Sequence, residues 1–218
     1  MWRDQSSGIL LVLSAPTGGG KTTIARRLAA RDPLVRFSVS HTTRSARPGE
    51  KNGVDYHFVD GHTFRAMAAR GEFLEWAKVH DHEYGTHRSE WKRAAAEGRD
   101  LILDIDVQGG LQVKKAEPAS LLVFILPPSL QVLLDRLGRR AGEQGFDLRR
   151  RLETALVELE LAGSYDYNVI NEDLDGAVDS VAAILASARL RPRACTAKVD
   201  ELRTEITHWL RSTNVHSG

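Results

Sequence analysis

The fold is decided by the stretch Gly8-Ile9-Leu10-Leu11-Val12-Leu13-Ser14-Ala15-Pro16-Thr17-Gly18-Gly19-Gly20-Lys21-Thr22-Thr23. Its apolar run, residues 9–13, has the length of a buried strand, and residues 24–30 favour a helix. Strand, glycine-rich turn, Lys-Thr and helix form the order of a phosphate-binding loop. Backbone N–H groups can wrap a triphosphate only where no β-carbon obstructs them, which explains the glycines. The pattern predicts a nucleotide-phosphate site that comprises Gly18, Gly19, Gly20, Lys21, Thr22 and Thr23.

Two side chains in this loop carry charge or metal chemistry. Lys21 is a point cation for the β- and γ-phosphates, and the Thr22 hydroxyl is a magnesium ligand. Ala15 stands where the strict pattern has its first glycine. The alternative interpretation is a glycine-rich turn with a chance lysine, and the pattern alone does not name a reaction.

Composition restricts the classes of protein that the chain can belong to. Its 218 residues, 42% of them hydrophobic, suit one domain or one domain with inserted pieces. A net charge of +1 argues against a nucleic-acid-coating protein. The lone Cys195 excludes a disulfide framework and a four-cysteine zinc site, which suits a cytoplasmic protein. We see no signal peptide and no stretch of membrane-spanning length, so no membrane partner is expected.

Alternating strand and helix patterns predict an α/β fold, a P-loop NTPase-like parallel sheet flanked by helices. The expected core covers residues 8–39 and 99–186. Residues 40–86 have the pattern of a small mixed α/β insertion. Residues 187–218 form a C-terminal extension, expected to be helical, whose apolar positions would pack on the domain or on a partner: Val199, Leu202, Ile206, Trp209 and Leu210.

A second signal is the strand pattern Leu101-Ile102-Leu103-Asp104-Ile105-Asp106. Aliphatic residues followed by aspartate describe a buried strand with a carboxylate at its carboxyl end, where ligands of open α/β sheets bind. That arrangement holds magnesium in phosphate-loop proteins. The alternative for either aspartate is a strand-end residue that caps the turn at 108–110.

Six arginines lie close together between two helix patterns, punctuated by glycine: Arg136, Arg139, Arg140, Arg149, Arg150 and Arg151. A basic, glycine-rich segment at about 138–151 is typical of a mobile, arginine-rich lid over a polyphosphate. For any single arginine, an exposed helix surface is the favoured alternative.

Several separated segments resemble one family, guanylate kinase. They are Ala15 to Lys21, Phe37 to Glu50, Asn52 to Tyr56, Phe73 to Trp76, Tyr84 to Thr86, Leu103 to Gly109 and Asn168 to Asp173. The resemblance covers about residues 8–186. It implies a core domain, a GMP-binding insertion at about 40–86 and a lid. The implied reaction transfers the γ-phosphoryl of ATP, with Mg²⁺ as cofactor, to GMP and to dGMP.

The resemblance also implies roles for individual residues. The GMP phosphate would be held by arginine and tyrosine side chains, namely Arg44, Arg47, Tyr56 and Tyr84. The guanine would be read by Glu75, Ser40 and Thr86, with Asp104 near the base. The transferring group would be neutralised by Lys21, Arg44, Arg47, Arg140 and Arg151. Thr22 and Asp104 would hold magnesium, and Asn171 would lie near the adenine of ATP.

Alternatives stand beside these roles. Tyr56 and Tyr84 could be packing aromatics, and Glu75 a salt-bridged edge residue. A kinase for another small molecule would need no guanine reader, and a non-catalytic guanylate-kinase-like module would lack Lys21. The segment 141–147 lacks the acidic run of usual family lids, so Arg140 could be confused with Arg139. A monomer and a homodimer both remain open.

Overall fold

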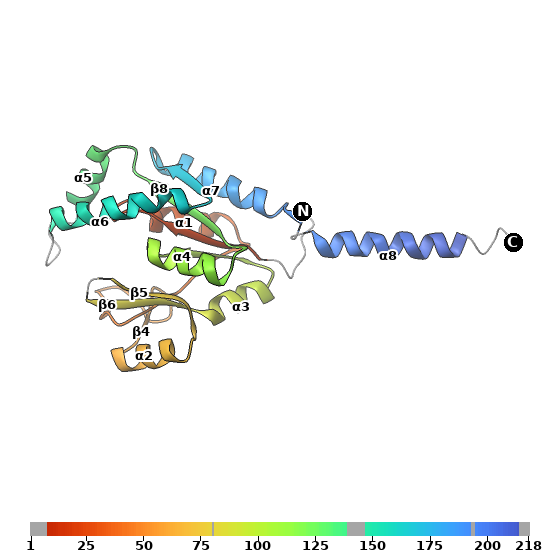
Figure 1. Cartoon of the computed structure of the whole chain (residues 1–218), viewed down its shortest axis with the longest axis horizontal. Helices are drawn as coiled ribbons and strands as arrows, with labels where there is room; N and C mark the ends of the chain where they lie inside the picture. The colour runs from red at the N-terminus through yellow and green to blue at the C-terminus, as the bar shows by residue number, and fades with distance from the viewer. Residues whose placement is uncertain (1–7, 80, 139–146, 193–194, 214–218) are drawn as a thin grey trace.

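The computed structural model describes residues 8–79, 81–138, 147–192 and 195–213. At its centre is a five-stranded sheet in the order β2-β7-β1-β8-β9, and every pairing in it is parallel (Figure 1). Its strands are β1 (Leu10–Ser14), β2 (Val35–Phe37), β7 (Asp100–Asp104), β8 (Leu121–Leu126) and β9 (Tyr167–Ile170). The predicted parallel sheet flanked by helices is confirmed.

Helices cover both faces of this sheet because its strands are apolar on both sides. The odd-numbered residues of β1, such as Leu11, pack with α1 (Lys21–Arg31) and α7 (Leu174–Ala188). The even-numbered residues, such as Val12, pack with α3 (Arg88–Ala96) and α4 (Val107–Ala116). Buried on both faces, the strands are continuous hydrophobic runs, as parallel strands usually are.

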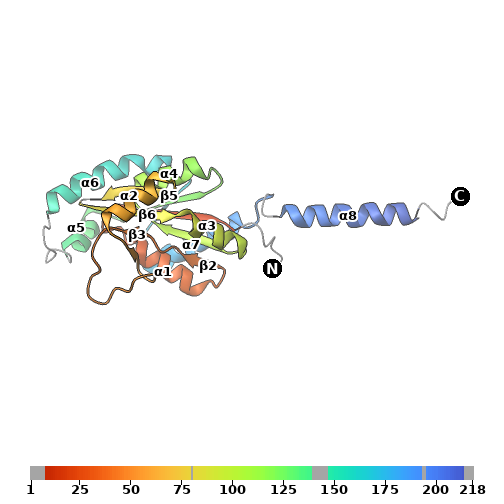
Figure 2. The same cartoon turned by 90° about the horizontal axis from the view of Figure 1, so that it is seen from below.

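Residues between β2 and α3 form a second, four-stranded sheet in the order β4-β3-β6-β5. Its strands are β3 (His41–Thr42), β4 (His57–Phe58), β5 (Phe73–Val79) and β6 (His82–His87). Helix α2 (Gly61–Ala69) covers it, and the stacked rings of Phe64 and Phe73 lie between them. Figure 2 shows the two sheets from a second direction. This unit lies beside α4, against which β5 packs.

Helix α4 is a correction to the sequence analysis, which continued the strand to Asp106 and expected only a turn at 108–110. The strand ends at Asp104, and Asp106 caps α4 by accepting a hydrogen bond from Gly109 N–H over 2.8 Å. The adjacent glycines Gly109 and Gly110 lower the helix propensity of this segment, and they obscured its helical pattern in the sequence. Close packing explains them, since a β-carbon on Gly110 would lie 2.5 Å from the Tyr165 hydroxyl.

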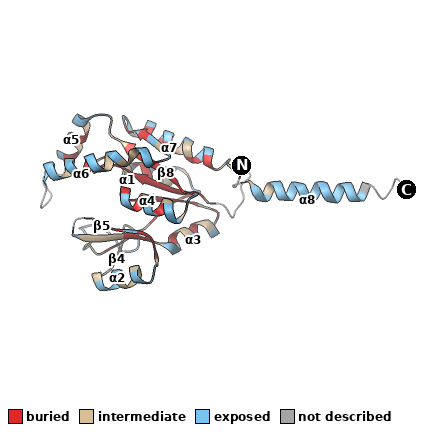
Figure 3. Ribbon diagram, in the orientation of Figure 1, coloured by how far each residue is buried: buried red, intermediate tan, exposed pale blue. Residues whose placement is uncertain are grey.

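The remaining helices follow β8. They are α5 (Leu130–Gly138), α6 (Leu148–Glu160), the short 3₁₀ helix η1 (Leu161–Ser164) and α8 (Thr196–Thr213). The three arginines at 149–151 lie in the first turn of α6, whereas most of the predicted lid, residues 139–146, lies outside the described residues. Helix α8 projects from the body of the protein, and its apolar side chains, including Val199 and Ile206, are exposed (Figure 3).

Candidate active site

The predicted phosphate loop connects β1 to α1 at the carboxyl edge of the central sheet. Gly18 and Gly20 have φ angles of +89° and +93°, which side chains with a β-carbon rarely adopt. Gly19 N–H donates to Pro16 C=O over 2.7 Å, and Gly20 is the N-cap residue of α1. The first N–H groups of α1 therefore point out of the loop and form an anion site.

Contacts from two other elements hold the loop in place. Asn171, just after β9, donates from Nδ2 to Gly19 C=O over 2.9 Å. Arg136 on α5 donates to the same carbonyl and to the Asn171 carbonyl, each over 3.2 Å. A β-carbon on Gly20 would lie 2.6 Å from Asn171 Nδ2. Asn171 is thus buried against the loop and supports its backbone.

Lys21 and Asp104 form an ion pair, with Nζ 3.0 Å from Oδ1. Because β1 and β7 are parallel and end at the same edge of the sheet, this ion pair can join the loop to the end of β7. Burial lowers the pKa of Lys21, but the Asp104 carboxylate more than offsets this and leaves the pKa above its ordinary value. Lys21 is therefore a permanent cation at the mouth of the loop.

The two aspartates of the second sequence signal have different positions. Asp104 pairs with Lys21 beside the phosphate loop, and Asp106 has the capping role that was its alternative. Apart from its ion pair, Asp104 Oδ1 is buried without a hydrogen-bond partner of good geometry among the described residues. Thr22 and Thr23 are exposed in the first turn of α1. A hydroxyl and a carboxylate are oxygen donors of the kind that Mg²⁺ prefers.

A buried carboxylate lies between the insertion and α4. Glu75 on β5 is 4% exposed, and its Oε1 accepts a hydrogen bond from Thr86 N–H over 2.8 Å. The Thr86 hydroxyl lies 3.4 Å from the Ser40 hydroxyl, so the three predicted guanine readers are neighbours. Burial raises the pKa of Glu75 to about 7, and the charge of Asp106 adds to this.

Arg44 and two tyrosines form a second group on the insertion. The guanidinium carbon of Arg44 lies 5.3 Å from the centre of the Tyr56 ring, and the Tyr56 and Tyr84 rings lie 6.1 Å apart. Arg44 donates two hydrogen bonds to Glu50, over 2.8 and 3.0 Å. Glu50 also accepts from Arg47 N–H over 2.7 Å. The Arg47 residue itself is exposed.

Tyr56 connects this group to the phosphate loop. Burial raises the pKa of the Tyr56 hydroxyl, and the nearby Asp104 carboxylate raises it further, while Lys21 lowers it. Tyr56 thus lies within electrostatic range of both Asp104 and Lys21. Arg26 on α1 also pairs with Asp55 of the insertion over 3.2 Å. The arrangement can therefore hold two phosphate groups, one at the loop and one at the insertion.

Of the predicted lid residues, Arg140 lies outside the described residues, and Arg151 is half-buried at the start of α6. Sequence reasoning missed the supporting roles of Glu50, which binds Arg44, and of Glu158, which accepts a hydrogen bond from Thr17 N–H. It recognised Arg136 only as one member of a basic cluster. No local pattern marks Arg136 and Glu158, because each acts on a distant part of the chain, whereas Glu50 binds Arg44 and Arg47 within its own segment.

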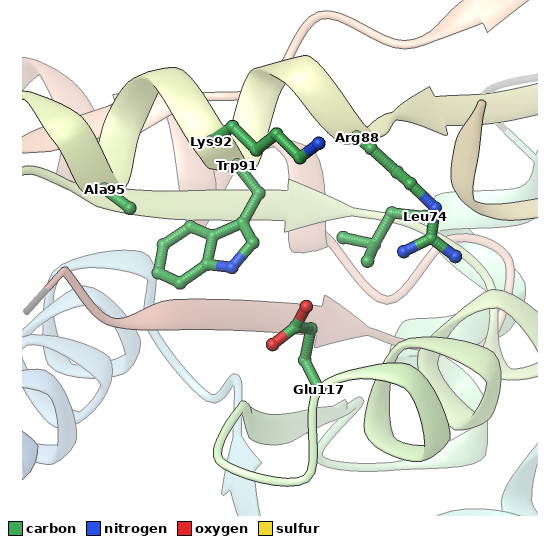
Figure 4. A pocket seen from close by; sticks show the side chains of 6 residues that line it. All are labelled: Leu74, Arg88, Trp91, Lys92, Ala95 and Glu117. Carbon is green, nitrogen blue, oxygen red and sulfur yellow. The ribbon is translucent and has the colours of Figure 1, made fainter.

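A separate pocket of about 340 Å³ lies between α3 and the end of α4 (Figure 4). Trp91 forms one wall, Glu117 points towards it from the opposite side, and Leu74, Arg88, Lys92 and Ala95 complete the lining. None of the predicted site residues lines it. The pocket is therefore distinct from the phosphate loop.

Comparison with known proteins identifies the family. The family model described as "Guanylate kinase" matches residues 7–188. The chain belongs to the guanylate kinase family. A guanylate kinase of Aromatoleum aromaticum is 48% identical over 184 residues, which cover 84% of this chain and 90% of that protein. One of Thermotoga maritima is 42% identical over 202 residues, 93% of this chain and 98% of the relative.

Solved structures agree with this family. The crystal structure of guanylate kinase from Anaplasma phagocytophilum has a TM-score of 0.71 and 33% identity, over 87% of this chain and 90% of that one. As a guanylate kinase, the chain is an enzyme that phosphorylates GMP with ATP. Within the described ranges, no helix is long and apolar enough to cross a membrane.

Proposed function

We propose that this guanylate kinase transfers the γ-phosphoryl group of MgATP to GMP, and to dGMP, through the residues that meet at the carboxyl edge of the central sheet. The observation that carries the proposal is the position of Tyr56. It stands beside Arg44 in the insertion and within the electrostatic reach of Lys21 and Asp104. A nucleotide held by the insertion would therefore present its phosphate to the phosphate loop.

The insertion, at about 40–86, is proposed to bind GMP. Ionised Glu75 would accept hydrogen bonds from guanine N1–H and from the exocyclic amine, which adenine cannot offer. Ser40 and Thr86 would bond the rest of the base edge, with Asp104 nearby. The GMP phosphate would lie between Arg44, Arg47, Tyr56 and Tyr84. Guanidinium forks suit a phosphate better than ammonium groups do.

Transfer then needs positioning and neutralisation of charge, with no covalent intermediate on the protein. The attacking atom is a GMP phosphate oxygen, whose own negative charge opposes its approach to ATP. Lys21 and Arg44 are proposed to offset this repulsion, assisted by Arg47, Arg140 and Arg151. Gly18, Gly19, Gly20, Lys21, Thr22 and Thr23 would hold the ATP phosphates, and Asn171 would lie on the adenine side.

Thr22 and Asp104 are proposed to hold magnesium. The donor set fits, because Mg²⁺ takes one or two protein oxygens and completes its shell with phosphates and water. The buried Asp104 Oδ1 supports this, since apart from its ion pair with Lys21 it has no hydrogen-bond partner among the described residues. When bound, the ion would neutralise part of the charge of the ATP phosphates.

The domain roles belong to the same proposal: a core of residues 8–39 and 99–186, a lid at about 138–151 that excludes water, and an extension at 187–218. We propose a cytoplasmic enzyme, since a lone Cys195 leaves no disulfide to form within the chain. Monomer and homodimer are both compatible with the site.

The experiment that tests this function is a coupled ADP-release assay with GMP, dGMP, AMP, CMP and UMP as acceptors. Turnover with GMP and dGMP only, dependent on added magnesium, is the expected result. Equal turnover with AMP would contradict guanine recognition, and turnover in EDTA would contradict the magnesium site.

A further inference from the structure

Helix α6 contacts the phosphate loop through a residue that has no role in the proposed chemistry. Thr17 N–H donates to Glu158 Oε2 over 3.3 Å, and this bond joins segments that are 141 residues apart in the chain. Thr17 lies directly before Gly18 in the loop. The last turn of α6 is thereby attached to the backbone that would surround the ATP phosphates.

The same helix carries Arg151 in its first turn. Arg151 and Glu158 are seven positions apart, which is about two helical turns, so both lie on one side of α6. Between them Ala155 is buried against Leu133 and Leu137 of α5. A β-carbon on Gly18 would lie 3.3 Å from Leu137 Cδ2, so this helix pair packs directly on the loop.

Charge alone does not account for the position of Glu158. Burial raises its pKa to about 6, the bond from Thr17 N–H lowers it, and the charges of Lys21 and Asp106 act in opposite directions. A carboxylate beside the ATP phosphates would repel them. A hydrogen bond from a backbone N–H needs only an acceptor oxygen, which a protonated carboxyl group or an amide also supplies.

We propose that Glu158 is a positioning residue: its bond to Thr17 N–H fixes α6 on the phosphate loop and so sets the place of Arg151 over the transferring phosphoryl group. The inference rests on the proposed role of Arg151. It predicts that an acceptor oxygen at the correct distance matters and that the negative charge does not.

Two substitutions separate these properties. Glu158→Gln keeps the length of the side chain and an acceptor oxygen but removes the charge. Glu158→Asp keeps the charge but shortens the side chain by one methylene, which withdraws the oxygen from Thr17. Glu160→Asp is the matched control, because Glu160 is exposed on the same helix. Thermal unfolding of each variant verifies that it is folded.

We expect Glu158→Gln to stay within 2-fold of the wild type in kcat. Glu158→Asp should lose between about 2-fold and 10-fold in kcat, the range for one net hydrogen bond. The KM for GMP should be unchanged. In an Arg151→Ala background, Glu158→Asp should lower kcat by less than a further 2-fold, because the arginine that Glu158 positions is already absent.

Loss of activity in the Gln variant as large as that in the Asp variant would overturn the inference, as would full activity of the Asp variant. So would additive effects of Glu158→Asp and Arg151→Ala. These failures differ from failure of the proposed function, in which Arg151→Ala alone would leave kcat unchanged.

Discussion

Glu75 Oε1 accepts a hydrogen bond from Thr86 N–H over 2.8 Å, and this bond fixes a buried carboxylate in the insertion. The other oxygen, Oε2, lies against α4, where a β-carbon on Gly109 would be 2.7 Å away. The carboxylate is therefore held between the insertion and the core. Its orientation depends on a glycine far away in sequence.

Gly109→Ala is expected to raise the KM for GMP several-fold and to leave the KM for ATP unchanged. The new methyl group cannot coexist with Glu75 Oε2, so the carboxylate must move. Steady-state kinetics with each substrate varied would measure this. Gly163→Ala is the control, because nothing lies within 4 Å of a β-carbon there. An unchanged KM for GMP would show that the carboxylate does not contact this substrate.

Lys21→Ala is expected to lower kcat by orders of magnitude while GMP still binds. Lys21 is proposed to serve the ATP side, and the predicted GMP contacts other than Asp104 lie on the insertion. Removal of the ammonium also leaves the Asp104 carboxylate without its ion pair. Turnover assays and calorimetric titration with GMP give the two readouts, with Lys115→Ala on the exposed face of α4 as control. Wild-type turnover would contradict the assignment.

How GMP affinity depends on pH follows from the carboxyl group of Glu75. Burial raises its pKa to about 7 in the unliganded protein. Below this pH the group is increasingly protonated and cannot accept two N–H donors, so the KM for GMP should rise as pH falls. The limiting slope is about tenfold per pH unit. The phosphate of GMP also titrates, near pH 6, in every assay. The control is therefore Glu75→Gln, which keeps the titration of the phosphate but should lack the part of the pH dependence that Glu75 causes. Parallel pH profiles of the KM for GMP in the wild type and in Glu75→Gln would contradict this role of Glu75.

His41 makes stability depend on pH in the acid range. Its ring is stacked 4.6 Å from His57 and lies 5.7 Å from His87, and its buried Nδ1 has no hydrogen-bond partner among the described residues. Burial, and then the charges of these two neighbours, lower the pKa of His41 from 6.5 to about 4. Between these values the unfolded chain binds a proton that the folded chain does not. The free energy of unfolding should therefore fall as pH falls through this window.

Thermal unfolding at a series of pH values tests this. His41→Gln has no titrating group and should show a shallower decline between pH 6.5 and about 4 than the wild type. His62→Gln, at an exposed position on α2, should follow the wild type. Identical curves for all three proteins would exclude His41 as the source of the decline.

The sequence predicts the central sheet well because its physical signals are local. The run Leu121–Leu126 is apolar throughout and ended by prolines, and the strand has these bounds. The phosphate loop is equally local. Asp104 and Asp106 follow the same apolar run, so the sequence could not show that Asp104 pairs with Lys21 while Asp106 caps α4.

The parts that the sequence does not predict depend on distant contacts. Gly109 and Gly110 obscure helix α4 in the sequence. They are explained by the close approach of the Glu75 and Tyr165 side chains, which leaves no room for a β-carbon. In the sequence, Glu158 does not differ from the other glutamates of this polar helix. Its contact with the phosphate loop is seen only in the folded structure. Residues that support a site through another residue leave no spacing pattern, whereas residues that bind phosphate do.

Glu75 is proposed to read guanine, and kcat/KM for GMP and for AMP in the wild type and in Glu75→Gln tests this role most directly. A site built on hydrogen bonds can reject an analogue that lacks them by ~10⁴-fold. We predict that the variant loses roughly 1–3 kcal/mol in kcat/KM for GMP, discriminates less against AMP and keeps its KM for ATP. Unaltered GMP kinetics in the variant would contradict the account and leave Glu75 a structural residue of the insertion.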